Sequence, residues 1–278
     1  MVRMTDRPLT LMAVHAHPDD EASTTGGILA KYSAEGVTTV LVTCTNGELG
    51  DTPDVQAGEE GHGDDHDGEA VVALRMKELR DSCDVLGITH LETLGYHDSG
   101  MEGWPQNDAP GSFWSTPVDE AAKPLIALIE KHQPDVVVTY DDYGFYGHPD
   151  HIQAHRITLA ALEATGSAAT VFFPTFQRSK LPEFRERMTA MGMEPPPIDE
   201  NEFGAPDEDI AVVVDATPFA QQKMDALKAH VSQAANIFFI HFPMEVFTEA
   251  FGREAFVRHS PAWTQGDPIG DDLFEGLR

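Results

Sequence analysis

The feature that most constrains this chain is an alternation of short apolar runs with longer segments of helical period. Short runs rich in Val, Ile and Leu predict buried strands. The segments between them repeat apolar residues every three or four positions, as an amphipathic helix requires. This alternation is typical of α/β proteins. We therefore predict a Rossmann-like α/β fold with a mostly parallel sheet flanked by helices.

Five apolar runs predict strands at residues 9–15, 37–44, 88–94, 134–140 and 171–173. Four segments of helical period predict helices at 23–35, 69–86, 118–132 and 151–164. Past residue 175 the pattern loosens, with a strand expected at 210–215 and a helix at 218–233. We expect one domain over residues 1–278, with a Rossmann-like core at 1–175 and a C-terminal elaboration at 176–278 that completes the substrate site. Three prolines at 195–197 leave a linker between two domains as the alternative.

The charge balance excludes several classes of partner. The chain has 18 Lys and Arg against 47 Asp and Glu, a formal net charge of −29. Nucleic acid and anionic membranes both require a concentrated basic surface, so we expect neither as a partner. No apolar run approaches the roughly 18 residues of a membrane helix, and no signal-type region follows Met1, so we expect a cytoplasmic protein. Cys44 and Cys83 lie in apolar segments, and we expect them to be core thiols.

Part of the acidic surplus is concentrated in one segment. Residues 51–70 hold eight Asp or Glu, four Gly and no Lys or Arg, which is typical of a solvated loop. Its His62 and His66 offer a metal no rigid geometry among so many glycines. Because this segment follows the second predicted strand, we expect an acidic flap near the site, which argues against strongly anionic substrates.

Residues able to perform acid, base or metal chemistry cluster directly after the predicted strands. They are, in chain order, His15, His17, Asp19, Asp20 and Glu21; Glu48; Tyr96, His97 and Asp98; and Asp141, Asp142, Tyr146, His148, Asp150 and His151. Ligands of open parallel sheets bind at the carboxyl ends of the strands, where the strand order reverses. With the order 3-2-1-4-5, the segments after the first and fourth strands would face each other there.

These two segments have the composition of a metal site. Imidazole and carboxylate suit a borderline divalent cation, and a tight turn at Pro18 lets His17 and Asp20 converge. The segment 148–151 repeats the pattern at a helix start. Two His and one carboxylate leave room for water, which is a catalytic arrangement. Either segment alone is also typical of an acidic helix start, but two after equivalent strands favour a metal site. His15 lies on the strand itself, and we expect it to orient the loop through an internal hydrogen bond.

The sequence resembles the LmbE/PIG-L family of zinc-dependent N-deacetylases, which act on N-acylated glucosamine derivatives. The resemblance is carried by A-H-P-D-D-E at 16–21 and H-P-D-H at 148–151. Further landmarks are T-C-T-N-G-E at 43–48, R-x-x-E-L at 75–79, L-G-Y-H-D-S-G-M at 94–101 and A-H-V-S-Q at 229–233. Within the family the likeness is greatest to the actinobacterial mycothiol enzymes, the conjugate amidase and the pathway deacetylase. The ending at 271–276 is more similar to the amidase, whereas the loop 51–70 departs from both.

The resemblance implies a role for each matching residue. The metal, zinc or alternatively Fe2+, would be bound by His17, Asp20 and His151. Asp19 would be the general base, His148 the acid or oxyanion stabiliser, and Tyr146 a contact of the tetrahedral intermediate. Substrate contacts would come from Asp98, Met101, Arg75 and Glu48.

We therefore predict an enzyme that hydrolyses, with a bound metal, the amide of an N-acylated amino-sugar conjugate. Whether it assembles as a homo-oligomer is left open by the sequence. One alternative is a metal-dependent sugar-binding or scaffold protein without turnover. Another is a non-haem iron enzyme with the same ligand set. Neither a G-x-G-x-x-G nor a G-x-S-x-G pattern supports a dinucleotide-binding protein or a serine hydrolase. His230 and Gln233 share a predicted helical face, where they either approach the site or fill the interior.

Overall fold

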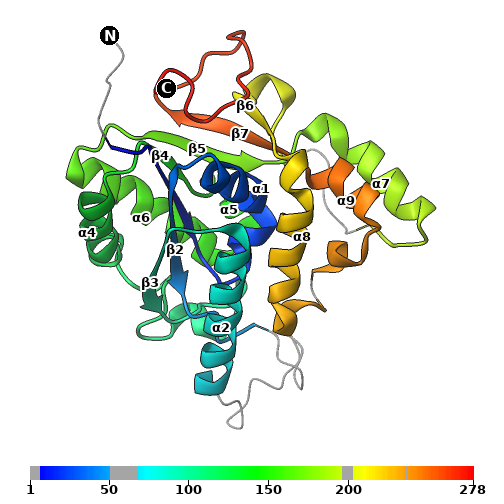
Figure 1. Cartoon of the computed structure of the whole chain (residues 1–278). Helices are drawn as coiled ribbons and strands as arrows, with labels where there is room; N and C mark the ends of the chain where they lie inside the picture. The colour runs from blue at the N-terminus through cyan, green and yellow to red at the C-terminus, as the bar shows by residue number, and fades with distance from the viewer. Residues whose placement is uncertain (1–6, 51–67, 196–202, 236) are drawn as a thin grey trace.

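The computed structural model describes residues 7–50, 68–195, 203–235 and 237–278. These residues form a seven-stranded sheet in the order β3-β2-β1-β4-β5-β7-β6, with helices packed on both faces (Figure 1). The strands β1 to β5 pair in parallel, and β7 is antiparallel to both of its neighbours. The α/β class and the strand order 3-2-1-4-5 are therefore confirmed.

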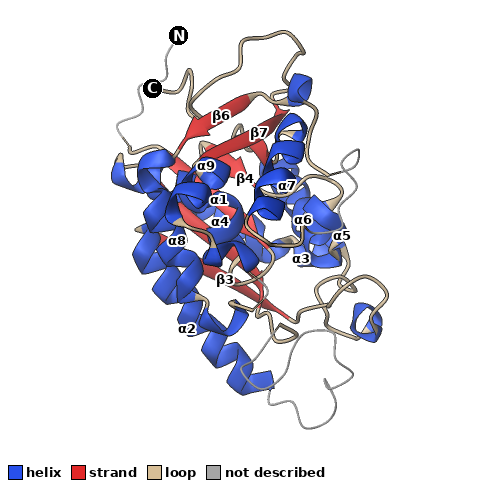
Figure 2. Ribbon diagram, turned by 90° about the vertical axis from the view of Figure 1, so that its right-hand side faces the viewer, coloured by secondary structure: helices blue, strands red, loops and turns tan. Residues whose placement is uncertain are grey.

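The strands have the following bounds: β1 Thr10–His15, β2 Thr38–Thr45, β3 His90–Tyr96, β4 Val136–Val138, β5 Thr170–Thr175, β6 Val212–Asp215 and β7 Arg253–Ser260. The helices are α1 Asp20–Ala34, α2 Gly68–Leu86, α3 Val118–Ala121, α4 Lys123–His132, α5 Gly144–Gly147, α6 Pro149–Thr165, α7 Leu181–Ala190, α8 Ala220–Ala229 and α9 Met244–Phe251. The turned view shows the sheet between its helices (Figure 2).

Several boundaries differ from the prediction for identifiable reasons. The helix expected over 118–132 is divided at Ala122, because Pro124 in the first turn of α4 cannot continue a preceding helical ladder. The helix expected over 218–233 ends at Ala229, where His230 leaves helical geometry at ψ 64. The elements α7, α9 and β7 were not predicted at all.

The central strand β1 divides the core into two layers. All six of its residues are buried. Leu11 and Ala13 pack with α1, α2 and α8 on one face, while Met12 and Val14 pack with α4 and α6 on the other. This separation follows from the two-residue period of a strand. Because β1 pairs with both β2 and β4, the segments that follow these strands emerge side by side.

The C-terminal residues extend the same sheet rather than forming a separate one. β7 pairs with β5 along one side and with β6 along the other. The residues after 175 therefore share the core of the earlier strands, which supports the proposal of one domain. Within the described ranges, none of the helices is both long and apolar enough to cross a bilayer.

Candidate active site

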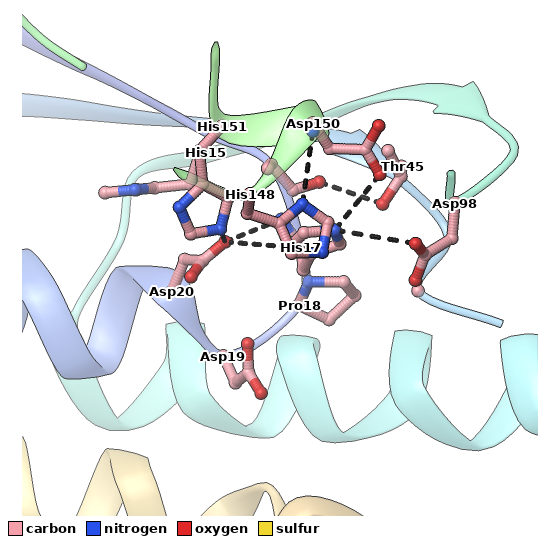
Figure 3. A network of polar contacts seen from close by, with 12 residues as sticks. His15, His17, Pro18, Asp19, Asp20, Thr45, Asp98, His148, Asp150 and His151 are labelled. Atoms are coloured by element: carbon pink, nitrogen blue, oxygen red, sulfur yellow. Dashed lines mark hydrogen bonds and ion pairs between the residues drawn. The ribbon is translucent and has the colours of Figure 1, made fainter. Parts of the chain in front are cut away.

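Side chains from three loops meet at the carboxyl edge of the sheet (Figure 3). The start of α1 brings His17 and Asp20, the start of α6 brings His148 and His151, and the segment after β3 brings Asp98. The two segments predicted to face each other are thus in contact, since nitrogens of His17, His148 and His151 lie within 4.8 Å of one another.

The loop after β1 is fixed from beneath by buried hydrogen bonds. His15 contacts the Thr25 hydroxyl at 2.9 Å through Nε2 and the Tyr140 hydroxyl at 3.3 Å through Nδ1, which confirms its expected internal hydrogen bond. The Tyr140 hydroxyl accepts the Ala16 N–H at 2.9 Å and donates to Asp20 Oδ2 at 2.7 Å. Tyr140 was not predicted as a residue of the site, although it lies at the end of the run predicted as the fourth strand.

Both ring nitrogens of His17 lie close to a carboxylate. Its Nδ1 lies 3.3 Å from Asp20 Oδ2, and its Nε2 lies 3.2 Å from Asp150 Oδ2. Asp150 is fully buried and also accepts the Ser99 N–H at 2.9 Å. A carboxylate on the far nitrogen of an imidazole is the usual support of a metal-binding histidine, because it fixes the ring and its tautomer. Asp150 therefore leaves His17 Nδ1 as the nitrogen that faces Asp20.

His151 shows the same arrangement with a backbone partner. Its Nδ1 is 3.1 Å from the Gly144 carbonyl oxygen, so this nitrogen is the donor. Its Nε2 is buried, has no hydrogen-bond partner within the described residues, and lies 3.5 Å from Asp20 Oδ2. Burial lowers the pKa of His151 to about 4, so the ring is neutral near pH 7. A buried, neutral nitrogen with a free lone pair is suited to bind a metal.

The distances around Asp20 fit a divalent cation. With bonds of about 2.0–2.1 Å, neighbouring ligand atoms of a tetrahedral site lie about 3.3 Å apart. The separations of 3.3 and 3.5 Å from Asp20 Oδ2 to His17 and His151 agree with that spacing. Two further groupings of possible ligands lie close together, His17 with His148 and His151, and His17 with Asp98 and Asp150, and both contain His17. The described residues thus contain a buried candidate metal site.

Asp19 lies outside this ligand cluster, with its carboxylate toward α2 (Figure 3). Its backbone is left-handed at φ 119, a strained conformation for a residue with a Cβ. Its N–H donates to Glu21 Oε2 at 2.9 Å, and its Oδ2 lies 3.3 Å from Arg75 Nη2. Burial raises the pKa of Asp19 to about 6, and the Arg75 charge opposes that rise. A carboxylate with such a pKa suits general-base chemistry near neutral pH.

A buried group lies beneath Asp19, and it joins Glu21 and His230, whose contact was not predicted, although an interior place for His230 was one of the two alternatives. Glu21 Oε1 accepts the Ser82 hydroxyl at 2.5 Å and lies 2.7 Å from His230 Nε2, and all three residues are fully buried. His230 therefore belongs to the interior rather than to the wall of the site. The sequence signal for this buried group is Glu21, the acidic residue that ends A-H-P-D-D-E. Its carboxylate accepts the hydrogen bond of the Asp19 N–H.

His148 is a neutral donor in this geometry. Burial, together with the nearby His17 and His151, lowers its pKa to about 2. Its Nδ1 accepts the Asp150 N–H at 3.1 Å, so the proton of the neutral ring resides on Nε2. His148 is therefore equipped to donate a hydrogen bond to a developing oxyanion, one of the two roles that the resemblance implies.

Tyr146 lies on the open side of the site. Its side chain is 48% exposed, and its ring lies edge-on to His151 at 4.9 Å and 6.1 Å from His148. It belongs to α5, a distorted turn in which Phe145 and Tyr146 have non-helical backbone angles.

Asp98 and Met101 both lie in the segment after β3, and their contact with a substrate stays a prediction. Asp98 accepts the Gly100 N–H at 2.8 Å and lies 3.7 Å from His17 Nε2. Met101 is 41% exposed in the segment after β3. Glu48 Oε1 contacts the exposed His97 ring at 2.6 Å.

Arg75 occupies a more interior position. It is 3% exposed and donates to the carbonyl oxygens of Pro18 at 2.6 Å and Gly47 at 2.5 Å. These contacts support the Asp19 loop, and a substrate contact for Arg75 stays a prediction. His62, His66 and most of the acidic segment 51–70 lie outside the described residues.

The comparisons with known proteins agree with this geometry. A family model described as PIG-L, GlcNAc-PI de-N-acetylase, matches residues 12–162, more than half of the chain. The chain belongs to the PIG-L/LmbE family. It is also 38% identical, over 96% of its length and 95% of the relative's, to a 1D-myo-inositol 2-acetamido-2-deoxy-alpha-D-glucopyranoside deacetylase of Acidothermus cellulolyticus. As a member of the PIG-L/LmbE family, it is a deacetylase, a hydrolase of linear amides.

Solved structures of similar fold include proteins of different activity. The N,N'-diacetylchitobiose deacetylase of Pyrococcus horikoshii has a TM-score of 0.55 at 21% identity, covering 90% of this chain and 83% of that one. The 4-carboxy-2-hydroxymuconate hydratase GalB of Pseudomonas putida has a TM-score of 0.59 at 16% identity, covering 94% and 100%. The fold alone therefore does not determine which reaction is catalysed. The function depends on the residues of the site.

Proposed function

We propose that this protein removes the acetyl group from the amide of an N-acetylglucosamine glycoside, with a 1D-myo-inositol glycoside as the first candidate substrate. Its metal ligands are His17, Asp20 and His151, and its metal is zinc, with Fe2+ as the alternative. The observation that carries the proposal is the position of Asp20 Oδ2. This oxygen lies 3.3 Å from His17 Nδ1 and 3.5 Å from His151 Nε2, both in buried rings, and His151 Nε2 has no hydrogen-bond partner among the described residues.

The proposed chemistry assigns one task to each group. A bound divalent cation supplies Lewis acidity, which lowers the pKa of a water molecule and polarises the amide carbonyl. The Asp19 carboxylate accepts the proton of the attacking water and returns it to the amide nitrogen as the C–N bond breaks, so that acetate and the free amine leave. His148 Nε2–H and the Tyr146 hydroxyl donate hydrogen bonds to the developing oxyanion, and each such donor is worth about 3–4 kcal/mol when preorganised.

The choice of substrate rests on the relatives and on the charge of the chain. The relative from Acidothermus cellulolyticus is a deacetylase of the 1D-myo-inositol glycoside of 2-acetamido-2-deoxy-alpha-D-glucopyranose. That substrate is neutral and its product is an amine, which a protein of net charge −29 does not repel. We therefore favour the deacetylase over the conjugate amidase that the chain's ending suggested.

A product assay tests the proposal. Purified protein with defined zinc is incubated with the inositol glycoside, with N-acetylglucosamine and with a mycothiol conjugate, and the free amine and acetate are measured. We expect acetate release from the inositol glycoside, lost on addition of a chelator. The control is Asp19→Asn, which we expect to keep its metal but lose most of its turnover. Saturable binding of the glycoside without any acetate would identify a sugar-binding protein and refute the deacetylase.

A further inference from the structure

The distorted turn α5 contains a strained residue directly before Tyr146. Phe145 lies at φ 69 and ψ −46, with Gly144 at φ 68 on one side and Gly147 at φ 89 two residues later. Glycine adopts positive φ freely, whereas a residue with a Cβ pays a steric penalty there. Such strain persists only where surrounding contacts hold the residue. The contacts of Phe145 therefore determine the path of the chain through Tyr146.

Two sets of contacts hold Phe145. Its N–H donates to Asp141 Oδ1 at 2.8 Å. Its ring packs against Phe176 at a centroid distance of 5.8 Å and edge-on against Phe203 at 5.5 Å. Phe176 and Phe203 stack on each other at 5.4 Å, and Phe176 also contacts Phe251 of α9. The ring of Phe145 is thus anchored on an aromatic pair that belongs to the C-terminal elaboration.

Tyr146 is half exposed and lies between rings on two sides. Its side chain is 48% exposed, and its ring contacts are Phe145 behind it and the rings of His148 and His151 in front. A half-exposed tyrosine on a short turn samples several rotamers unless the backbone limits them. With the positive φ of Phe145, its ring points toward Phe176 and Phe203. The side chain of the next residue, Tyr146, then lies beside His151.

We propose that Phe145 is a positioning residue for Tyr146, and that the aromatic pair of Phe176 and Phe203 fixes the Tyr146 hydroxyl over the metal site through it. The inference rests on the proposed function, because Tyr146 acts on the oxyanion only if the protein is a deacetylase. It extends that function by giving the C-terminal elaboration a part in turnover. A misplacement of about 1 Å in a reacting group can cost about a hundredfold in rate, so loss of the anchor should be visible in kcat.

The first experiment is a double-mutant cycle between residues 145 and 146. Phe145→Gly, Tyr146→Phe and the double variant are compared with the wild type for kcat and KM on the acetylated glycoside, and for metal content. We expect Phe145→Gly to lower kcat by about tenfold to a hundredfold with KM and metal content little changed. In the Tyr146→Phe background the same change should cost less than about twofold, because interacting residues are non-additive. An equal loss in both backgrounds would overturn the proposal.

A matched control separates positioning from general stability. Phe203→Ala removes half of the anchor, whereas Phe184→Ala removes a ring that packs on Phe242 and Phe251 without touching Phe145. Both variants should melt at lower temperature than the wild type. We expect only Phe203→Ala to lower kcat, and an equal effect of Phe184→Ala on kcat contradicts the proposal.

Hydrogen–deuterium exchange gives a readout that does not need turnover. Peptides spanning residues 141–148 should exchange faster in Phe145→Gly and Phe203→Ala than in Phe184→Ala or the wild type. If the wild type releases no acetate but this difference in exchange is found, the deacetylase function fails while the anchoring of the loop stands. If acetate is released but exchange is the same in all four proteins, the positioning proposal fails and the function stands.

Discussion

Asp19 combines three structural properties at one residue. Its backbone is left-handed, its N–H is held by Glu21, and its carboxylate lies between a buried environment and the Arg75 guanidinium. Burial favours the protonated form, and the arginine favours the ionised form. The balance of these two opposing effects decides at which pH Asp19 can act as a base.

The pH dependence of turnover follows from this balance. The pKa of Asp19 is raised to about 6, and the base is active only when ionised. The value of kcat/KM should therefore fall as pH decreases through about 6, approaching a tenfold loss per pH unit. Arg75→Gln removes the charge that stabilises the ionised form, so its acid limb should move to higher pH, whereas Arg75→Lys should move it less. A pH–rate profile measures both, and an acid limb near pH 4 in the wild type would contradict the assignment.

At the residue scale, the contiguous motifs predicted most of the site. His17 and Asp20 directly follow the first predicted strand, and His148 and His151 lie together in the segment that follows the fourth. The contact of Asp150 with His17 joins residues 133 positions apart, and that of His230 with Glu21 joins residues 209 apart. Periodicity and composition carry no information on such pairs, so their partners could not be derived.

The helix α1 is held at its middle by a residue from the far end of the chain. Glu254 of β7 accepts the N–H groups of Gly27 and Ile28 at 2.8 and 2.9 Å, and also binds Lys223 at 2.7 Å. A Cβ at Gly27 would lie 2.7 Å from Glu254 Oε1, so only glycine leaves room for this contact. Because α1 begins at Asp20, the buried ion pair supports the element that carries the proposed ligands.

Removing this carboxylate should therefore be costly. Glu254→Gln leaves Lys223, which is 3% exposed, as a buried charge without its partner. Breaking a buried pair from one side costs about 3–5 kcal/mol in the free energy of unfolding, as measured by denaturant titration. The control is Lys77→Ala, which disrupts the exposed pair with Asp81 and should cost less than about 1 kcal/mol. Similar values for the two variants would show that the Glu254 pair does not stabilise the fold.

At the element scale, prediction succeeded where local sequence decides the structure. The strands β1 and β2 are built mainly from apolar residues and threonines, which suit strands buried on both faces. The strand β7 reads R-E-A-F-V-R-H-S, with charged residues at both ends, and its place is decided by pairing with β5, about 80 residues earlier. The helices α7 and α9, of 10 and 8 residues, lie past residue 175, where the alternation of apolar runs and helical segments that guided the prediction loosens.

At the scale of the whole molecule, the site joins loops from both halves of the parallel sheet. A ligand that binds only the folded arrangement stabilises the whole molecule, by about 4 kcal/mol at a thousand times its dissociation constant. Metal binding should therefore be measurable as a change in global stability as well as in turnover.

The cytoplasmic location stays a prediction, and the formation of a homo-oligomer stays open.

Metal removal gives the corresponding prediction. The wild type saturated with zinc should melt at higher temperature than the same protein after chelation, by several degrees in differential scanning calorimetry. His17→Ala should lack this difference, because it removes one of the proposed ligands, whereas His97→Ala, an exposed ring outside the ligand set, should retain it. An unchanged zinc response in His17→Ala means that the ligand set is wrong.

The strand order also has a consequence for how the chain is made. β6 precedes β7 in sequence, yet within the described part of the sheet it pairs only with β7. During synthesis β6 is therefore made before its partner strand, and it can pair only after residues 253–260 have been synthesised. Glu254 lies in that same stretch, so the N–H groups of Gly27 and Ile28 in α1 also gain their hydrogen bonds to Glu254 only then. A nascent chain can assemble the parallel strands early, but it should acquire a rigid catalytic edge only when its last strand is inserted.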